Sequence, residues 1–367
     1  MTMKIVYDHQ IFAIQEYGGI SRYFYELASR MAGYEGCEVC VHAPLYVNRY
    51  IRNNDLFKVM GVYVPRIPRT GRALLRMNDL CGRLFPPKEM PDIVHETYHS
   101  HYVAAPAKYG TVITVYDMIH EKYKDLAPAS ESTSRNKASA VKRADRIICI
   151  SENTKKDLIH YFNVNPDKIS VIYLGYSMSR TLSPQKLNIG DAPYILYVGQ
   201  RYAYKNFHRL LEAYSSSTRL MKTFKLVCFG SVGFSRDELS LMGKLNLNPE
   251  NIVHLSGSDD VLSVLYSNAA VFVFPSLCEG FGIPLLESMS FRCPVVCSNT
   301  SSLPEVAGDA AEYFDPFNIE DMARAIDTVV FSTDRRKALI ERGLQRINLF
   351  SWEKCAEKTL EVYRSLS

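Results

Sequence analysis

The stretch from Phe274 to Glu287 has the residue types and the spacing to bind a phosphorylated ligand. It places glycines and Pro284 between an apolar run and a helical pattern, and glycine lets backbone amides approach a ligand closely. The amides and the dipole of a helix start together favour a phosphate group. Glu279 and Glu287 add carboxylates, which accept hydrogen bonds from sugar hydroxyl groups. The alternative is that Glu287 only complements the helix dipole and that Glu279 is a solvated loop charge.

Two series of short apolar runs, separated by helical patterns, must position this stretch, and such runs are typical of parallel strands buried on both faces. The runs are 4–7, 39–42, 92–95, 112–116, 146–150 and 169–173, followed by 194–198, 225–229, 252–255, 271–274, 295–298 and 311–314. They predict an α/β fold with two doubly wound parallel sheets, in which ligands bind beyond the carboxyl ends of the strands. We predict an N-terminal domain over 1–178, a C-terminal domain over 179–350 and a last helix within 351–367. The polar stretch 177–193 is the expected hinge.

Composition narrows the class of protein. The 367 residues are 47% apolar and 22% charged, which suits two soluble domains of ordinary size. No apolar run approaches the roughly 20 residues that span a bilayer, and the N-terminus lacks the order of a secretory signal, so we expect a cytoplasmic protein. Nine scattered cysteines argue against a disulfide framework, and Cys37 and Cys40 lack the second pair of a zinc site. A net charge of +4 is too small to indicate nucleic-acid binding.

The segment from Arg66 to Arg83 alternates basic and apolar side chains. One interpretation is an amphipathic surface on anionic lipid, which would place the protein peripherally on the inner face of the cytoplasmic membrane. The other interpretation is a solvated helix face over the domain core.

Glu279 and Glu287, with seven residues between them, resemble the signature of retaining glycosyltransferases of family four. Other blocks that resemble this family cover almost the whole chain: Gly18-Gly19, 150–158, Gly199 to Arg201, Lys205-Asn206 and 302–316. The resemblance implies the GT-B fold. In that fold an acceptor-side N-terminal domain and a donor-side C-terminal domain face a central cleft, and the last helix crosses back to the first domain.

The resemblance also implies roles on the donor side. Arg201 and Lys205 would hold the donor diphosphate. Negative charge develops on this diphosphate as it leaves, and cations that bind it more tightly in the transition state than in the ground state lower the barrier. Glu287 would bind the ribose hydroxyls. Glu279 and the backbone amides that follow it would bind the transferred sugar. The other expected donor-binding residues are Gly18, Gly19, Gly199, Asn206, Gly257, Gly280, Phe281, Gly282 and Ile283. Transfer of this kind requires no metal ion or other cofactor. The alternatives are solvated strand-end cations at Arg201 and Lys205, and a simple turn glycine at Gly257.

On the acceptor side, Tyr116 and Asp117 follow a predicted strand where the family commonly has His and then Asp. Tyr116 therefore takes the place of a histidine that lies near the transferring sugar in the family. Asp117 or His120 is expected to contact the acceptor or to act as general base, although a lone histidine such as His120 is often structural. Tyr116 and His95 are expected to line the acceptor side.

A metal site is the competing interpretation of His95, His99 and His101 with Glu96. Their spacing matches no recognised ligand pattern, and the resembled family needs no divalent ion, so we predict no metal site.

The blocks 7–12 and 18–23 resemble bacterial surface-polysaccharide mannosyltransferases. The resemblance predicts transfer of a sugar with retention, with mannose from GDP-mannose as the first candidate donor. The expected acceptor is a saccharide or polyprenyl-linked saccharide in O-antigen, lipopolysaccharide or capsule synthesis. UDP-sugars are the alternative donors.

Three other classes of protein share parts of this pattern. A nicotinamide dehydrogenase should carry Gly-x-Gly-x-x-Gly after its first strand, and the chain does not. A sugar-nucleotide epimerase should lack the paired-glutamate helix. A non-catalytic assembly partner should have lost Arg201, Lys205 or a glutamate.

Overall fold

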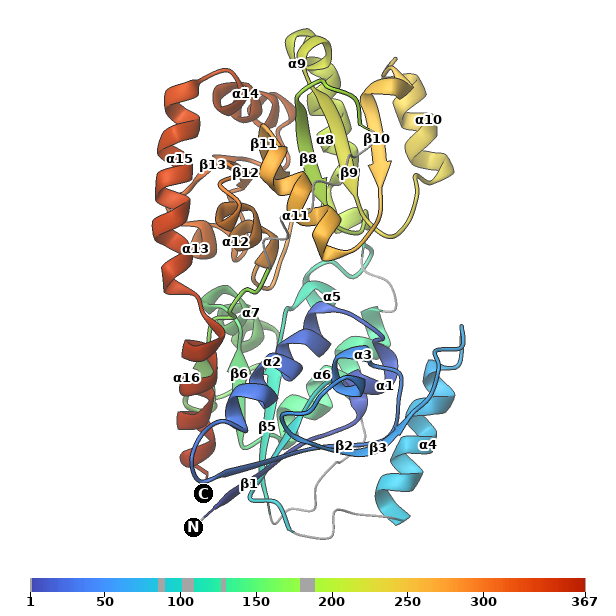
Figure 1. The fold of residues 1–367 in the computed structure, drawn as a ribbon, viewed down its shortest axis with the longest axis vertical. Helices are drawn as coiled ribbons and strands as arrows, with labels where there is room; N and C mark the ends of the chain where they lie inside the picture. The colour runs from blue at the N-terminus through green and yellow to red at the C-terminus, as the bar shows by residue number, and fades with distance from the viewer. Residues whose placement is uncertain (1, 85–89, 101–108, 127–129, 179–188, 367) are drawn as a thin grey trace. The chain divides into compact units, whose positions relative to one another are not determined.

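The computed structural model describes residues 2–84, 90–100, 109–126, 130–178 and 189–366 (Figure 1). The chain divides into two compact units. Unit 1 comprises Met1–Glu121, Ala129–Gly175 and Trp352–Ser367, and unit 2 comprises Lys122–Pro128 and Tyr176–Ser351. Most of the predicted hinge lies outside the described residues.

Unit 1 is built on a seven-stranded parallel sheet with the order β3-β2-β1-β4-β5-β6-β7. The strands are β1 (Met3–Tyr7), β2 (Cys37–Tyr46), β3 (Lys58–Tyr63), β4 (Ile93–Glu96), β5 (Gly110–Val115), β6 (Arg146–Cys149) and β7 (Ile169–Val171). The helices are α1 (Gln10–Ile14), α2 (Gly19–Met31), α3 (Arg49–Arg52), α4 (Gly71–Leu84), α5 (Ile119–Lys122), α6 (Ser130–Arg143), α7 (Glu152–Phe162), η1 (Pro166–Lys168) and α16 (Trp352–Arg364).

Strand β3 is the one element of this sheet that the apolar runs did not predict. It lies at the sheet edge, and its residues are exposed or half-buried. Its apolar residues, Val59, Met60, Val62 and Tyr63, were not among the predicted strands. It also approaches β2 closely, since a Cβ on Gly61 would lie 1.7 Å from the carbonyl oxygen of Ala43. Only glycine allows this approach.

The predicted last helix is present as α16, and within unit 1 it packs against α2 (Figure 1). Trp352 and Tyr363 of α16 are buried, and the Trp352 ring lies 6.2 Å from the ring of Tyr23 in α2. An ion pair of 2.8 Å between Arg30 and Glu353 adds a contact at the rim. The amphipathic pattern therefore placed an apolar face against an apolar face.

Unit 2 is built on a six-stranded parallel sheet with the order β10-β9-β8-β11-β12-β13. The strands are β8 (Tyr194–Val198), β9 (Lys225–Phe229), β10 (Ile252–Leu255), β11 (Val271–Phe274), β12 (Val295–Ser298) and β13 (Ala311–Phe314). The helices are η2 (Ala203–Lys205), α8 (Phe207–Ser216), α9 (Thr218–Thr223), α10 (Arg236–Lys244), η3 (Pro249–Asn251), α11 (Asp259–Asn268), α12 (Ile283–Ser290), α13 (Leu303–Ala307), α14 (Ile319–Val330), α15 (Thr333–Arg346) and η4 (Ile347–Leu349).

Alternate residues along the strands of unit 2 serve two apolar layers. Ile195 and Tyr197 of β8 belong to a core cluster that includes α8 and α14, whereas Leu196 between them is buried outside this cluster. Helix α12 contacts α11, α13 and α15 in a second group of helices. Both faces are covered, which explains the uninterrupted apolar runs and confirms the predicted fold class.

None of the helices in the described parts of the chain has the length and apolar composition needed to cross a bilayer.

Candidate functional site

The loops after β8 and β11 meet where the strand order of the unit 2 sheet reverses. From β8 the chain builds β9 and β10 to one side, and β11 starts the other side. A ligand binds most readily at such a reversal, beyond the carboxyl ends of the strands. The two loops are joined by a hydrogen bond of 2.8 Å from Leu277 N to Tyr204 O. The topology therefore brings the predicted cations and the paired-glutamate stretch to one edge.

Lys205 and Glu279 form an ion pair across these loops, with 2.6 Å between Nζ and Oε1. Both side chains are largely buried, at 17% and 11% exposed. The ammonium group also lies 5.5 Å from the centre of the Phe274 ring. Low exposure strengthens this charge pair relative to a surface pair, because solvent screens it less.

The Arg201 side chain contacts a different part of unit 2, the loop after β9 and the start of α10. Its Nε donates to Glu238 Oε1 at 2.7 Å, and its Nη2 donates to the carbonyls of Val232 and Gly233 at 2.7 and 2.6 Å. The two predicted diphosphate ligands thus come from one segment after β8. Lys205 is paired with Glu279 of the loop after β11, and Arg201 is paired with Glu238 of α10. Sequence reasoning missed Glu238, because its partnership joins residues 37 positions apart.

The main chain at Glu279 is held by two serines that follow β12. Ser301 Oγ accepts from Glu279 N at 2.8 Å and donates to Glu279 O at 2.6 Å. Ser302 Oγ lies 2.9 Å from the same carbonyl and 3.1 Å from the carbonyl of Phe281. Both serines were missed as site residues, although their place directly after a strand at the same edge was a usable signal.

The remainder of the paired-glutamate stretch folds as a turn into α12. Gly282 precedes the helix with φ of 102°, a conformation that favours glycine, and Pro284 occupies the first turn. The Phe281 side chain is buried against Phe350, so only its backbone faces the loop surface. Ile283 and Glu287 lie one turn apart on α12, and Glu287 Oε2 lies 3.5 Å from the Tyr266 hydroxyl. Gly280 lies within the loop itself.

The other predicted donor-side residues of unit 2 mostly contact the protein itself or shape its backbone. Asn206 is fully buried, and its amide donates to Pro316 O at 2.8 Å and accepts from Arg209 at 3.0 Å. Gly199 has φ of 129° directly after β8. Gly257 follows β10, and a Cβ there would lie 2.8 Å from Val261 Cγ2. These residues shape the edge, and their contact with a donor stays a prediction.

In unit 1 the loops after β1 and β4 are tied together at the corresponding reversal of strand order. Asp8 Oδ1 accepts from Thr97 N at 2.8 Å and from Thr97 Oγ1 at 2.6 Å. Gly18 and Gly19 lie at the start of α2, where a Cβ on Gly18 would meet Gln15 Oε1 at 2.4 Å, while Gly19 has open space. Sequence reasoning did not single out Asp8 and Thr97.

The loop after β5 holds Tyr116, Asp117 and His120. Tyr116 is buried, its hydroxyl donates to Thr97 O at 3.3 Å, and burial raises its pKa well above the usual range. Asp117 is 30% exposed, and its carboxylate accepts from Ile119 N at 3.1 Å. His120 Nδ1 is buried without a hydrogen-bond partner among the described residues. Asp117 therefore has a partly exposed carboxylate and His120 has a buried ring nitrogen without a partner among the described residues, whereas Tyr116 is fixed and neutral.

Buried Lys137 of α6 anchors this loop. Its Nζ donates to Asp117 O at 2.7 Å and to Glu121 Oε2 at 2.8 Å, and it lies 3.9 Å from Asp117 Oδ1. Lys137 and Glu121 are only 2% and 3% exposed. One ammonium group thus fixes both ends of the segment that carries Asp117 and His120, a role that the sequence did not reveal.

His95 lies in the core of unit 1, away from any surface. It is 0% exposed, its Nδ1 lies 2.6 Å from the Tyr363 hydroxyl and its Nε2 2.9 Å from Thr114 Oγ1. Burial lowers its pKa to about 3, so the ring is neutral. This placement argues against the predicted acceptor contact, because neither ring nitrogen has room for a ligand.

The metal interpretation gains no support from the described residues, which contain no group of three His, Cys, Asp or Glu side chains able to hold an ion. His99 is buried with Nε2 at 3.0 Å from Thr114 O, and burial lowers its pKa to about 3. His101 lies outside the described residues.

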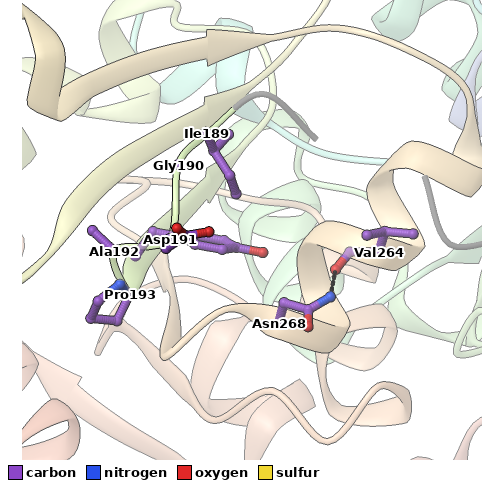
Figure 2. Close-up of a pocket in the computed structure, with 8 residues that line it drawn as sticks. Ile189, Gly190, Asp191, Ala192, Pro193, Val264 and Asn268 are labelled. Atoms are coloured by element: carbon purple, nitrogen blue, oxygen red, sulfur yellow. Dashed lines mark hydrogen bonds between the residues drawn. The ribbon is translucent and has the colours of Figure 1, made fainter. Parts of the chain in front are cut away.

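A cavity of about 330 Å³ opens elsewhere on unit 2 (Figure 2). It is lined by residues 189–194, which lead into β8, and by Val264 and Asn268 of α11. It therefore lies at the amino end of β8, opposite the edge that carries Lys205 and Glu279. Its described lining has an acidic residue, Asp191, and no basic one, so it does not suit a diphosphate.

Solved structures with the same architecture are glycosyltransferases and related sugar enzymes. Sucrose-phosphate synthase from Thermosynechococcus elongatus has a TM-score of 0.79 at 18% identity, and the lipopolysaccharide glycosyltransferase WaaG has 0.73 at 19%, each over 99% of both chains. Identity this low reports the fold alone, and that fold is GT-B, with two Rossmann-like units.

Two family models match consecutive parts of the chain: "Glycosyltransferase Family 4" over residues 17–180 and "Glycosyl transferases group 1" over residues 179–346. The chain belongs to glycosyltransferase family 4, as its motifs indicated.

Its curated relatives include bacterial O-antigen enzymes. O-antigen chain mannosyltransferase B of Escherichia coli is 34% identical over 235 residues, 61% of each chain. The serotype-specific mannosyltransferase WbdA of Escherichia coli is 29% identical over 302 residues, which is 75% of this chain and 37% of that protein. The matched region thus spans less than two thirds of these relatives.

Proposed function

We propose that the chain transfers a sugar from a nucleotide sugar to a saccharide or polyprenyl-linked saccharide acceptor in the synthesis of a cell-surface polysaccharide. Mannose from GDP-mannose is the first candidate donor, because both relatives named above carry mannosyltransferase names. The Salmonella typhimurium relative at 28% identity is likewise named as an O-antigen chain mannosyltransferase, RfbU. Family membership and these names support the proposal together.

The observation that carries this proposal is the ion pair of Lys205 and Glu279 at the strand reversal of unit 2, with Arg201 in the same loop. In the proposed step the bond from sugar C1 to the phosphate oxygen breaks, and the nucleoside diphosphate leaves with the electron pair. The acceptor oxygen forms the new bond on the same face, which retains the configuration, and its proton passes to the leaving phosphate. Arg201 and Lys205 stabilise the charge that develops on that phosphate, so no metal ion or other cofactor is needed.

On the donor side, Glu279 and the amides of Gly280, Phe281 and Gly282 would contact the transferred sugar. Glu287 would accept hydrogen bonds from the ribose. The loop geometry supports this assignment, because the serines after β12 fix the main chain at Glu279 while its carboxylate is directed to Lys205.

On the acceptor side, we assign contact with the acceptor hydroxyl to Asp117 or His120 and not to Tyr116. The proton of that hydroxyl passes to the leaving phosphate, so the contact needs only a side chain that can accept a hydrogen bond. The Tyr116 hydroxyl is buried and donates to Thr97 O.

The protein is also proposed to bind the surface of an anionic membrane through α4. Met77, Leu80 and Leu84 of α4 are 52%, 59% and 63% exposed, and they lie on one helix face at spacings of three and four residues. Exposed Arg76 lies beside them. An apolar stripe with a cation matches the chemistry of a bilayer with anionic headgroups. The side chains of Arg72 and Arg83 lie outside the described residues.

Incubation of the purified chain with GDP-mannose or a panel of UDP-sugars and a polyprenyl-linked saccharide acceptor tests the transfer. We expect a glycosylated product from one donor, unaffected by EDTA, with an α-linkage in its NMR coupling constants. Epimerised donor without transfer would instead support an epimerase, and no turnover of any donor would support a non-catalytic partner.

Sedimentation with vesicles tests the membrane surface. We expect binding to phosphatidylglycerol vesicles and little to phosphatidylcholine, with binding lowered by Leu80→Glu and by salt. Leu239→Glu, at a similarly exposed leucine of α10, is the matched control and should bind as the wild type does. Equal losses in both variants would contradict the role of α4.

A further inference from the structure

The guanidinium group of Arg201 is held on several sides in unit 2. It is 6% exposed and makes the three hydrogen bonds described above, to Glu238 and to the carbonyls of Val232 and Gly233. Its centre lies 4.9 Å from the ring of Phe234. Nε and Nη2 therefore already donate hydrogen bonds within unit 2, whereas Nη1 makes no hydrogen bond to the described residues.

Glu238 is itself fixed by the start of α10. Its Oε2 accepts from Ser235 N at 2.6 Å, and Ser235 Oγ accepts from Glu238 N at 3.2 Å, which together form a capping box. One carboxylate oxygen thus binds the helix start and the other binds Arg201. The orientation of the Arg201 fork is coupled in this way to a regular helix.

The loops on either side of Arg201 are packed together at glycines. A Cβ on Gly230, directly after β9, would lie 2.8 Å from the carbonyl oxygen of Gly199, directly after β8. His254 of β10 adds a contact of 2.9 Å between its Nε2 and Gly230 O. The segment that surrounds Arg201 therefore has little room to rearrange.

From these contacts we propose that Glu238 is a positioning residue, which holds Arg201 so that Nη1 is presented to an oxygen of the donor diphosphate. This inference rests on the proposed function, in which unit 2 binds a nucleoside diphosphate. A free arginine side chain loses rotamer freedom when it binds a ligand, and an arginine already held by a carboxylate has lost it beforehand. The guanidinium group is planar and donates in fixed directions, so its orientation matters more for diphosphate binding than the position of its charge.

A carboxylate near a diphosphate also has the opposite effect, because it weakens the local positive potential. The two effects predict opposite results when the charge of Glu238 is removed. If orientation dominates, Glu238→Gln binds the diphosphate more weakly, and if the potential dominates, it binds more tightly. The direct contacts of Arg201 at 2.6 to 2.7 Å favour orientation, since charge-assisted hydrogen bonds of this length are strong and directional.

Titration calorimetry with GDP, UDP and the corresponding monophosphates tests the role of Glu238. We expect Glu238→Gln to weaken binding of the preferred diphosphate about tenfold or more, the scale of one lost charge-assisted hydrogen bond, and to change monophosphate binding much less. The double variant Arg201→Ala/Glu238→Gln should bind no more weakly than Arg201→Ala alone.

Ser235→Ala is the matched control, because it removes the capping hydroxyl but keeps the backbone N–H that binds Glu238 Oε2 and the carboxylate that binds Arg201. It should bind the diphosphate as the wild type does, and thermal unfolding of each variant reports whether it is folded. Unchanged or tighter diphosphate binding by Glu238→Gln would overturn the role of Glu238, as would an equal loss in Ser235→Ala. Should Glu238→Gln fail to fold, the same comparison is made with Glu238→Asp, which keeps the charge and shortens its reach. Absence of binding by the wild type would instead overturn the proposed function itself.

Discussion

Lys205 Nζ lies 2.6 Å from Glu279 Oε1, and this ion pair joins the loops after β8 and β11. The pair keeps a cation and an anion together at an edge where both are largely shielded from water. A phosphate that approaches Lys205 meets an ammonium group that is already oriented by its partner. The pair is therefore the point at which the proposed chemistry is most sensitive to substitution.

Lys205→Met should lower the turnover number about a hundredfold or more, the scale expected when one group that stabilises a developing charge is lost. The measurement is the initial rate at saturating donor, with thermal unfolding as the check on folding. Lys222→Met, at an exposed lysine of α9, should leave the rate unchanged. A Lys205→Met variant with wild-type turnover would contradict the assignment.

Lys137→Met should destabilise the folded chain by about 3–5 kcal/mol, because it leaves the Glu121 carboxylate buried without its cation. Adding Glu121→Gln to this variant should restore much of the loss. The measurement is urea unfolding, and Lys142→Met, exposed on the same helix, should stay within about 0.5 kcal/mol of the wild type. A double variant as unstable as Lys137→Met would show that the ion pair is not the cause.

His95 should make stability depend on pH below neutrality. Burial lowers its pKa to about 3, while the unfolded chain binds a proton near pH 6.5, so protonation of the unfolded chain removes stability as the pH falls from 6.5 toward 3. Glu96, whose pKa burial raises to about 7, acts with the opposite sign in part of this range. The comparison is therefore made between variants.

Between pH 7 and pH 5, His95→Gln should lose less unfolding free energy than the wild type does. Urea unfolding at both pH values measures the difference. His160→Gln, at an exposed histidine of α7, should lose as much as the wild type. If His95→Gln and the wild type lose equal amounts, the buried neutral ring is not responsible.

Gly199→Ala should destabilise unit 2 by about 1–3 kcal/mol and weaken donor binding, because φ of 129° strains any residue with a Cβ. Gly243→Ala, within α10 and with no contact of the added Cβ beyond the backbone of its own helix, should be neutral or slightly stabilising. Thermal unfolding and nucleotide titration separate the two effects. Equal behaviour of both variants would mean that the backbone at Gly199 carries no strain.

Buried strands and the loops at their carboxyl ends were predictable because both faces of each sheet are covered, which leaves continuous apolar runs. The edge strand β3 was missed although it carries an apolar run that only Gly61 interrupts. The selection of Arg201, Lys205 and Glu279 followed from the motif resemblance, and their place at one edge followed from the rule that ligands bind beyond the carboxyl ends of parallel strands. The family and the fold class followed from motif positions and are confirmed.

Partners that lie far apart in sequence were not predictable. Glu238 reaches Arg201 across two loops, and Ser301 reaches Glu279 from the next strand end, so no local pattern marks them. His95 shows a different limit. Its place near a strand end suggested a ligand contact, but alternate strand residues point to opposite faces, and this one points to Tyr363.

A buried chain of hydrogen bonds runs from Tyr7 to Tyr363, His95, Thr114 and Tyr23. Its first link joins residues 356 positions apart, both in unit 1. During synthesis the chain must therefore emerge from the ribosome at least as far as Tyr363 before unit 1 can close its core. Unit 2 ends at Ser351 and can fold before Tyr363 emerges. Unit 1 begins at the N-terminal side of the chain but completes its fold last.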